Sequence, residues 1–166
     1  NRDLTRRLGE LGMNAQDNQR LTQHIHALRL ALLRARQPAD VVQTLAACLK
    51  EDFAGESVRV ISFTTIPGML GDWFSHIPAE DPRLQPFADC LANGEPICGR
   101  LNPEKLPVLF GDDRVHTQSI ALIPVADVGL IAVGSADPHR FYPGMGTLFL
   151  RWIGELYHTA LLQTRQ

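Results

Sequence analysis

The sequence predicts an α+β domain in which a central antiparallel sheet of five or six strands is flanked by helices and preceded by a long N-terminal helix. Residues 119–126 and 130–135 form two short runs that are β-branched and apolar at nearly every position, as in strands covered on both faces of a sheet. A helix with an apolar stripe follows them, and this stripe needs an apolar surface to cover. Residues 1–36 add a heptad-like repeat.

The N-terminal region, residues 1–36, places apolar residues at alternating spacings of three and four, with one phase shift near Asn18. A stripe this narrow is typical of a helix that pairs with a second helix, so we predict a coiled coil that forms a parallel homodimer. The alternative is that the second half of the helix packs on its own domain. The predicted dimerisation residues are Leu4, Leu8, Leu11, Leu21, Ile25, Leu28 and Leu32.

Residues 37–166 are predicted to form one domain that begins with a helix and a strand. Pro38 suits the first turn of a helix, and apolar residues continue at helical spacing to about Phe53. Within 58–64, Val58, Val60 and Ser62 alternate with Arg59, Ile61 and Phe63, so that two faces carry different side chains, and this predicts a strand. The connection after this strand is rich in turn-forming residues, and 73–77 is predicted to be a short edge strand.

The middle of the chain is predicted to hold a further helix and a short strand. Asp81 and Pro82 form a helix N-terminus, and the helix reaches about Ala92 before Asn93 and Gly94 end it. A short strand is then expected over residues 97–101.

A tight turn joins the two apolar runs near the C-terminus. Asp127 can hydrogen-bond its own backbone and Gly129 tolerates positive φ, so residues 126–129 predict a β-hairpin with antiparallel pairing. The amphipathic helix that follows is predicted from about Met145 to about Gln163.

Composition and charge argue against several classes of protein. Hydrophobic residues make up 45% and charged residues 20% of the chain, which is typical of a globular protein and not of a disordered one. The formal net charge of -2 gives no overall field that favours nucleic acid or acidic membranes. No apolar run is long enough for a membrane-spanning helix. Three cysteines without a secretory signal predict a cytoplasmic location.

Several segments of the chain resemble known families. Residues 129–135, Asp137, Arg140-Phe141 and Leu148-Phe149-Leu150 together resemble the C-terminal half of a GAF domain. More narrowly, the segments that resemble a GAF-like bacterial family catalogued as domain of unknown function 484 are Cys98-Gly99-Arg100-Leu101, Leu109-Phe110-Gly111 and residues 144–150. The resemblance covers nearly the whole chain. It implies a GAF-like fold, and it implies no activity because the family has none established.

The resemblance also implies where a ligand would bind, because the middle helix and the loops after it line the ligand cavity of GAF domains. The aromatic residues before that helix would either cover the cavity as a lid or fill one end of the core. Arg100 and Arg114, with Ser119, could approach a small anion, or the two arginines could be solvated on loops. We predict neither a metal nor a cofactor. The candidate pocket residues are Trp73, Phe74, His76, Phe87, Cys98, Arg100, His116 and Ser119.

The sequence shows no established catalytic motif, because it has neither a GxSxG nor a P-loop pattern. Some GAF-fold proteins reduce methionine sulfoxide with cysteines of the middle region, where this chain has Cys90 and Cys98. However, the chain has Thr117-Gln118-Ser119 where such enzymes would have the catalytic cysteine. We therefore predict a protein that is not an enzyme.

The predicted function is that of a homodimeric sensory or regulatory module with a small molecule as its partner. A ligand in the pocket would bias the two N-terminal helices of the dimer. The alternative is a protein-interaction scaffold whose pocket is filled by its own aromatic side chains. A third hypothesis is a thiol-based reductase.

Overall fold

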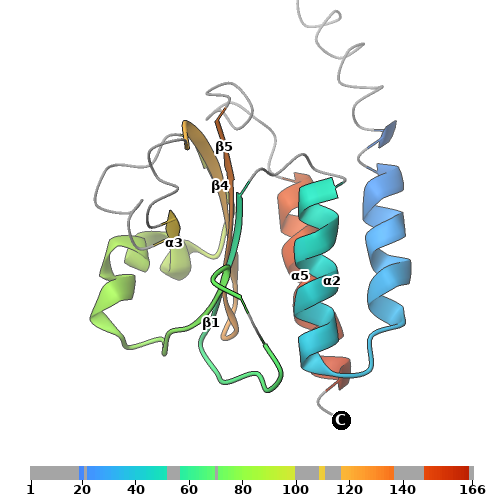
Figure 1. The fold of residues 1–166 in the computed structure, drawn as a ribbon. Coiled ribbons are helices and arrows are strands. Elements are labelled where there is room, and N and C mark those ends of the chain that lie inside the picture. Colours follow the sequence, from blue (N-terminus) through green and yellow to red (C-terminus); the bar gives the residue numbers. More distant parts are fainter. Residues whose placement is uncertain are drawn as a thin grey trace, which may run out of the picture.

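In the part of the chain that the structure describes, a five-stranded sheet separates a layer of long helices from a layer of short ones (Figure 1). The computed structural model describes residues 19–20, 22–51, 57–69, 71–99, 109–110, 117–136 and 148–164. The elements in chain order are α2 (Pro38–Glu51), β1 (Ser57–Ser62), β2 (Phe74–His76), the 3₁₀ helix η1 (Pro82–Phe87), α3 (Ala88–Asn93), β3 (Ile97–Gly99), β4 (Ser119–Val125), β5 (Gly129–Ser135) and α5 (Leu148–Thr164). Residues 22–33 are also helical, and we call them the N-terminal helical segment. None of the helices in these described ranges is long and apolar enough to span a membrane.

The predicted hairpin is confirmed as the antiparallel pair β4 and β5, whose register runs from Ser119 opposite Ser135 to Val125 opposite Gly129. Asp127 adopts a φ of 60° in the turn between them. Gly129 is needed for a reason that the sequence did not reveal. A Cβ atom at this position would lie 1.9 Å from the carbonyl oxygen of Ile61, so only glycine lets β1 approach β5 this closely.

The sheet is mixed, and the prediction of a wholly antiparallel sheet is wrong at one edge. The strand order is β2-β1-β5-β4-β3, and β2 pairs with β1 in parallel while the other three pairs are antiparallel. Turns at Pro67-Gly68 and at 71–73 interrupt the connection between β1 and β2. The chain therefore returns to β1 in the direction of β1, which a tight hairpin turn does not permit.

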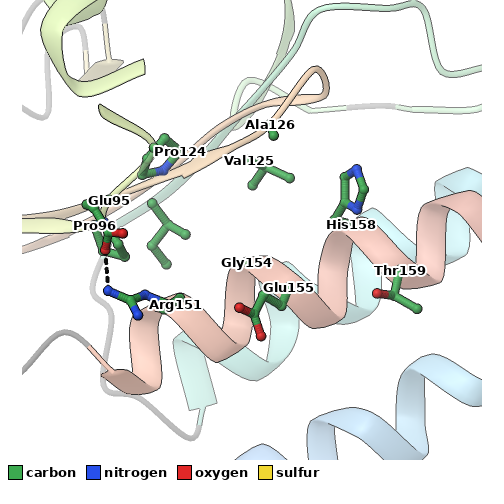
Figure 2. A pocket seen from close by; sticks show the side chains of 12 residues that line it. Glu95, Pro96, Pro124, Val125, Ala126, Arg151, Gly154, Glu155, His158 and Thr159 are labelled. Atoms are coloured by element: carbon green, nitrogen blue, oxygen red, sulfur yellow. Dashed lines mark hydrogen bonds and ion pairs between the residues drawn. The ribbon is translucent and has the colours of Figure 1, made fainter. Parts of the chain in front are cut away.

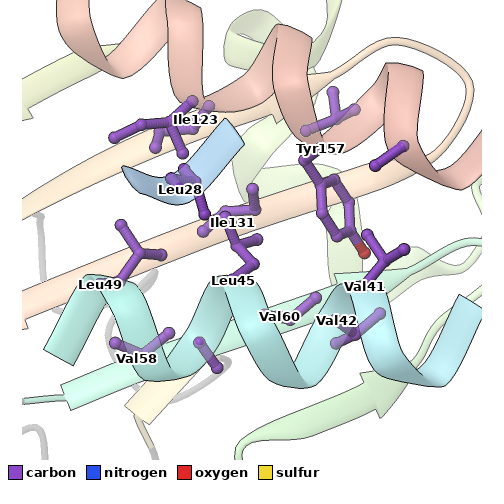
Figure 3. Packing of buried hydrophobic residues seen from close by; sticks show 14 of the residues in the cluster. Leu28, Val41, Val42, Leu45, Leu49, Val58, Val60, Ile123, Ile131 and Tyr157 are labelled. Atoms are coloured by element: carbon purple, nitrogen blue, oxygen red, sulfur yellow. The ribbon is translucent and has the colours of Figure 1, made fainter. Parts of the chain in front are cut away.

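Two apolar clusters fill the two faces of the sheet. The larger one joins the sheet to α2 and α5, and Figure 3 shows many of its members. The smaller one lies under η1 and α3 on the opposite face and is built around Leu84, Phe87, Phe110, Ile120 and Leu122. Alternate residues of β4 enter opposite clusters, as the two-residue period of a strand requires.

The N-terminal helical segment belongs to the larger cluster. Ile25, Leu28 and Leu32 are buried together with residues of α2 and α5, and Figure 1 shows the segment beside these two helices. This burial agrees with the alternative, in which the second half of the helix packs on its own domain, and pairing of residues 1–36 with a second copy stays a prediction. Alternating three- and four-residue spacings are produced equally by a helix that packs on two helices of its own chain. Leu4, Leu8, Leu11 and Leu21 lie outside the described residues.

The middle helix begins and ends where the sequence predicts. The Asp81 carboxylate accepts a hydrogen bond from the backbone N–H of Arg83, and Gly94 ends α3 with a φ of 69°. The first six residues are nevertheless 3₁₀-helical, with Pro86 inside them. This tighter winding changes the phase of the helix, and Ala88, one residue after the buried Phe87, is exposed.

Candidate functional site

A pocket of about 340 Å³ lies between α5 and the end of β4, on the face of the sheet that carries the long helices (Figure 2). Its volume is at the lower end of the range for small-molecule sites. The residues that line it are Gly94, Glu95, Pro96, Ile123, Pro124, Val125, Ala126, Arg151, Gly154, Glu155, His158 and Thr159.

One wall of the pocket is a single face of α5. Arg151, Gly154, Glu155, His158 and Thr159 follow the spacings i, i+3, i+4, i+7 and i+8, which place them on one side of a helix. Gly154 lies at the point where the helix and the sheet come closest. A Cβ atom on Gly154 would lie 2.9 Å from Cγ2 of Ile123. The missing side chain therefore lets α5 lie close to β4 and leaves polar side chains around the contact.

The opposite wall is the last part of β4, where its edge is not covered by β3. The three residues of β3 pair with β4 only as far as Leu122, which lies opposite Ile97. Pro124 follows two residues later, and a proline has no N–H group to offer a neighbouring strand. The segment Gly94–Pro96 lies at this uncovered edge instead of a strand. Proline in β4 and glycine in α5 thus create the space together.

The charges of the pocket lie at its rim. Arg151 and Glu95 form an ion pair, drawn as a dashed line in Figure 2. Their side chains are 47% and 54% exposed, so the pair contributes less than about 1 kcal/mol to stability and can be exchanged for a ligand at little cost. Glu155 and His158 add a second carboxylate and an imidazole. The rim can therefore bind both an anionic and a cationic group.

A metal centre is not supported by the described residues, since they contain no group of three or more His, Cys, Asp or Glu side chains that could hold an ion.

The family model described as "Protein of unknown function, DUF484" matches residues 1–163. The chain belongs to the DUF484 family. A comparison with curated proteins found no match. The resemblance to the DUF484 family is thereby confirmed. Because the description of DUF484 gives no activity, the chemistry of the pocket has to be argued from its own side chains.

The residues predicted to line a pocket in this DUF484 chain lie at both edges of the sheet. Trp73 precedes β2, and Phe74 and His76 lie within it at one edge, while Cys98 lies in β3 at the other edge. Trp73 and Phe74 make an edge-to-face contact with ring centroids 6.3 Å apart, and both pack against the larger cluster. They therefore extend the core, which agrees with the hypothesis that these aromatic residues fill one end of it.

The other predicted pocket residues are separated by the sheet itself. Phe87 is fully buried in the smaller cluster. Ser119 lies two residues before Ala121 on β4, and Ala121 is the register partner of Cys98. Ser119 and Cys98 therefore share the face of the sheet that is opposite to Phe87. Arg100, Arg114 and His116 lie outside the described residues. The predicted set is thus distributed over both edges and both faces of the sheet and does not form one lining.

The two cysteines of the middle region also lie on opposite faces. Cys90 is buried in the smaller cluster, whereas Cys98 packs against the larger one. The sheet between them prevents a disulfide without rearrangement. Burial raises the pKa of the Cys98 thiol to about 11. Since the thiolate is the nucleophilic form, this environment disfavours attack by Cys98 near neutral pH.

Sequence reasoning missed the polar face of α5. It identified the helix and part of its buried stripe, but it gave no role to Arg151, Glu155 or His158. A signal was present, because Gly154 lies inside the helix among good helix formers. An interior glycine costs about 1 kcal/mol relative to alanine and often marks a close approach. Such a position beside polar residues at helical spacing is a useful indication of a site.

Proposed function

We propose that this DUF484 protein is a non-enzymatic, GAF-like regulatory module that binds a small molecule in the pocket between α5 and β4. The observation that supports this function best is the composition of the pocket. Its floor is apolar, with Ile123, Val125 and Pro96, and its rim carries opposite charges in Arg151 and Glu95. An apolar surface with a few convergent polar groups is the usual form of a ligand site.

The GAF-like assignment is supported by the order of the elements. A helix, a strand, a short middle helix, a hairpin and a long final helix follow one another along the chain, and helices cover both faces of the sheet. This is the arrangement that the resemblance implied, apart from the parallel edge strand β2. The assignment concerns architecture, and the ligand has to be inferred from the pocket.

The non-enzymatic character is supported by the thiols. The reductase hypothesis needs a reactive thiolate and a resolving cysteine near it. Cys98 has a raised pKa, and Cys90 lies on the far side of the sheet. Cys90 and Cys98 therefore lack the proximity that the third hypothesis requires.

The charges indicate a small zwitterionic ligand. A carboxylate of the ligand would replace Glu95 as the partner of Arg151, and an ammonium group would lie near Glu95 or Glu155. The ligand would then exchange one exposed ion pair for two charge-assisted contacts that are partly shielded from water. An apolar side group would cover Ile123 and Val125.

Native mass spectrometry of protein purified gently from its own host tests this function. We expect one small molecule per chain, and a denatured control identifies the mass that is released. The variant Ala126→Trp should fill the pocket and abolish the bound mass, because Ala126 lines it. The control Ala47→Trp changes an exposed residue of α2 in the same way and should retain the ligand. Equal occupancy in both variants would place the ligand elsewhere.

A second candidate is the protein-interaction scaffold, which is supported by the filled face of the sheet under η1 and α3. Leu84, Phe87 and Phe110 occupy that face with side chains of the chain itself. Protein that carries no bound small molecule, and whose Tm is not raised by any of a panel of amino acids and other zwitterions, would favour the scaffold.

Homodimerisation through residues 1–36 stays a prediction, and sedimentation equilibrium tests it.

A further inference from the structure

We propose that the outward face of the N-terminal helical segment binds an acidic amphipathic helix of a partner protein. This inference is independent of the ligand pocket. Leu30 and Leu33 lie in the centre of the face and are 47% and 64% exposed. Within one helix, leucines at a spacing of three point in similar directions and form a short apolar strip, and the exposed His26 lies on the same face one turn before Leu30.

The orientation of this strip is fixed by the opposite side of the same helix. Ile25, Leu28 and Leu32 are buried in the larger cluster, so Leu30 and Leu33 have to point away from the core. With about 100° per residue, Leu30 lies roughly opposite the centre of the buried stripe. Folding of this chain therefore explains the buried leucines and leaves the exposed ones without a function in the fold.

Arginines border the exposed strip on both sides. Arg29 lies about 40° beyond Leu33 and Arg34 about 40° beyond Leu30, since each pair is four residues apart. Both arginines are exposed, and no ion pair is described for either of them within the described ranges. The sequence between Asn18 and Ala39 contains no acidic residue at all. The face therefore combines an apolar centre with uncompensated positive charge.

The exposed face with Leu30 and Leu33 fits a single partner helix better than a membrane surface or a second copy of the chain. An apolar strip with charged residues along both margins is how helices pair and choose partners of opposite charge. The strip is also narrow, whereas a helix that lies in a membrane surface needs a broad apolar face. A second copy placed with the same face inward would bring arginines against arginines, which is unfavourable. A partner helix with leucine-like residues flanked by Glu or Asp satisfies both features.

The test uses the full chain and a synthetic, fluorescein-labelled helix of Leu and Glu in which the leucines lie on one face. Fluorescence anisotropy should show binding of this peptide and not of a peptide with the same composition in scrambled order. The double variant Leu30→Gln/Leu33→Gln should bind about tenfold or more weakly, which corresponds to about 1.4 kcal/mol. Arg29→Gln/Arg34→Gln should also weaken binding and reduce its dependence on salt.

Matched controls exist elsewhere on the surface. Leu162→Gln changes a leucine of α5 that is 50% exposed, and Arg83→Gln neutralises an arginine on the opposite side of the sheet. Both controls should bind the peptide as the unchanged chain does. Circular dichroism should show that all variants keep their helix content, because every substituted side chain is exposed.

Three results would overturn the proposal. Equal binding of the scrambled peptide would show attraction by charge alone. Loss of self-association in Leu30→Gln/Leu33→Gln, seen by sedimentation equilibrium, would make the face a contact between copies. Binding of vesicles with anionic lipid that depends on the same two leucines, without binding of the helical peptide, would make it a membrane contact.

Discussion

Leu28→Ala tests whether the N-terminal helical segment is part of the core of its own chain. The side chain of Leu28 is fully buried among residues of α2, α5 and the sheet. Leucine-to-alanine changes at buried sites cost about 2–5 kcal/mol, depending on how far the surroundings relax. The segment is an outer helix with room to adjust, so we expect about 3 kcal/mol, near the middle of that range. In a chain of this length such a loss lowers Tm by about 6–12 °C.

Leu30→Ala is the matched control, because it makes the same chemical change two residues away in the same helix. Leu30 is 47% exposed and Ala is as good a helix former as Leu, so the expected loss is within about 0.5 kcal/mol. The contrast between the two variants isolates burial from helix propensity.

Urea unfolding, followed by tryptophan fluorescence and circular dichroism at several protein concentrations, measures both variants. The effect of Leu28→Ala should be independent of protein concentration, because the contacts of Leu28 lie within one chain. Equal losses for Leu28→Ala and Leu30→Ala would refute the burial of Leu28 in the core of its own chain. A midpoint that rises with concentration, and loses this dependence in Leu28→Ala, would instead place Leu28 in a seam between two copies.

Three further predictions concern single sites. Gly129→Ala should lower the free energy of unfolding by at least about 2–3 kcal/mol or prevent folding, since its Cβ would meet the carbonyl oxygen of Ile61. A midpoint of urea unfolding like that of the unchanged chain would contradict this close approach of β1 and β5. Burial raises the pKa of the Cys98 thiol to about 11, so iodoacetamide near neutral pH should modify Cys98 about 100-fold more slowly in the folded chain than in the chain unfolded by urea. Mass spectrometry follows the two rates, and similar rates would disprove the burial. Hydrogen bonds from Arg83 lower the pKa of Asp81, so this contribution to stability is complete above the usual carboxyl pKa and is lost as pH falls below it. Arg83→Ala should therefore move the NMR titration of Asp81 to higher pH, and an unchanged titration would show that Arg83 is not the cause.

The central part of the fold could be predicted because its signals are local. Two apolar β-branched runs around Asp127 define the hairpin β4–β5, and the stripe after them defines α5. The direction of β2 could not be predicted in the same way. Phe74–His76 reads as a strand in either direction, and only the path of residues 63–73 decides that it pairs in parallel with β1.

The candidate site was harder to predict because it is built by contacts between distant segments. Arg151 and Glu95 are 56 residues apart, and neither stands out in the sequence around it. The segment containing Leu28 shows a different difficulty. Its periodicity specifies a buried stripe, but it does not specify whether the covering helices belong to the same chain. The surface that covers such a stripe can therefore be identified only when the positions of the neighbouring helices are known.

In the part of the chain that the structure describes, the two edge strands of the sheet are each three residues long, and this shortness has a consequence for aggregation. β4 and β5 are buried over nearly their whole length and have the uncharged, β-branched character of segments that form intermolecular cross-β structure. They lie inside the sheet, shielded by β1 on one side and by β3 and Pro124 on the other. Short edges offer a passing strand few free hydrogen-bonding groups. Aggregation of this protein should therefore require disruption of the whole sheet, and it should not begin by addition of a strand to the folded edge.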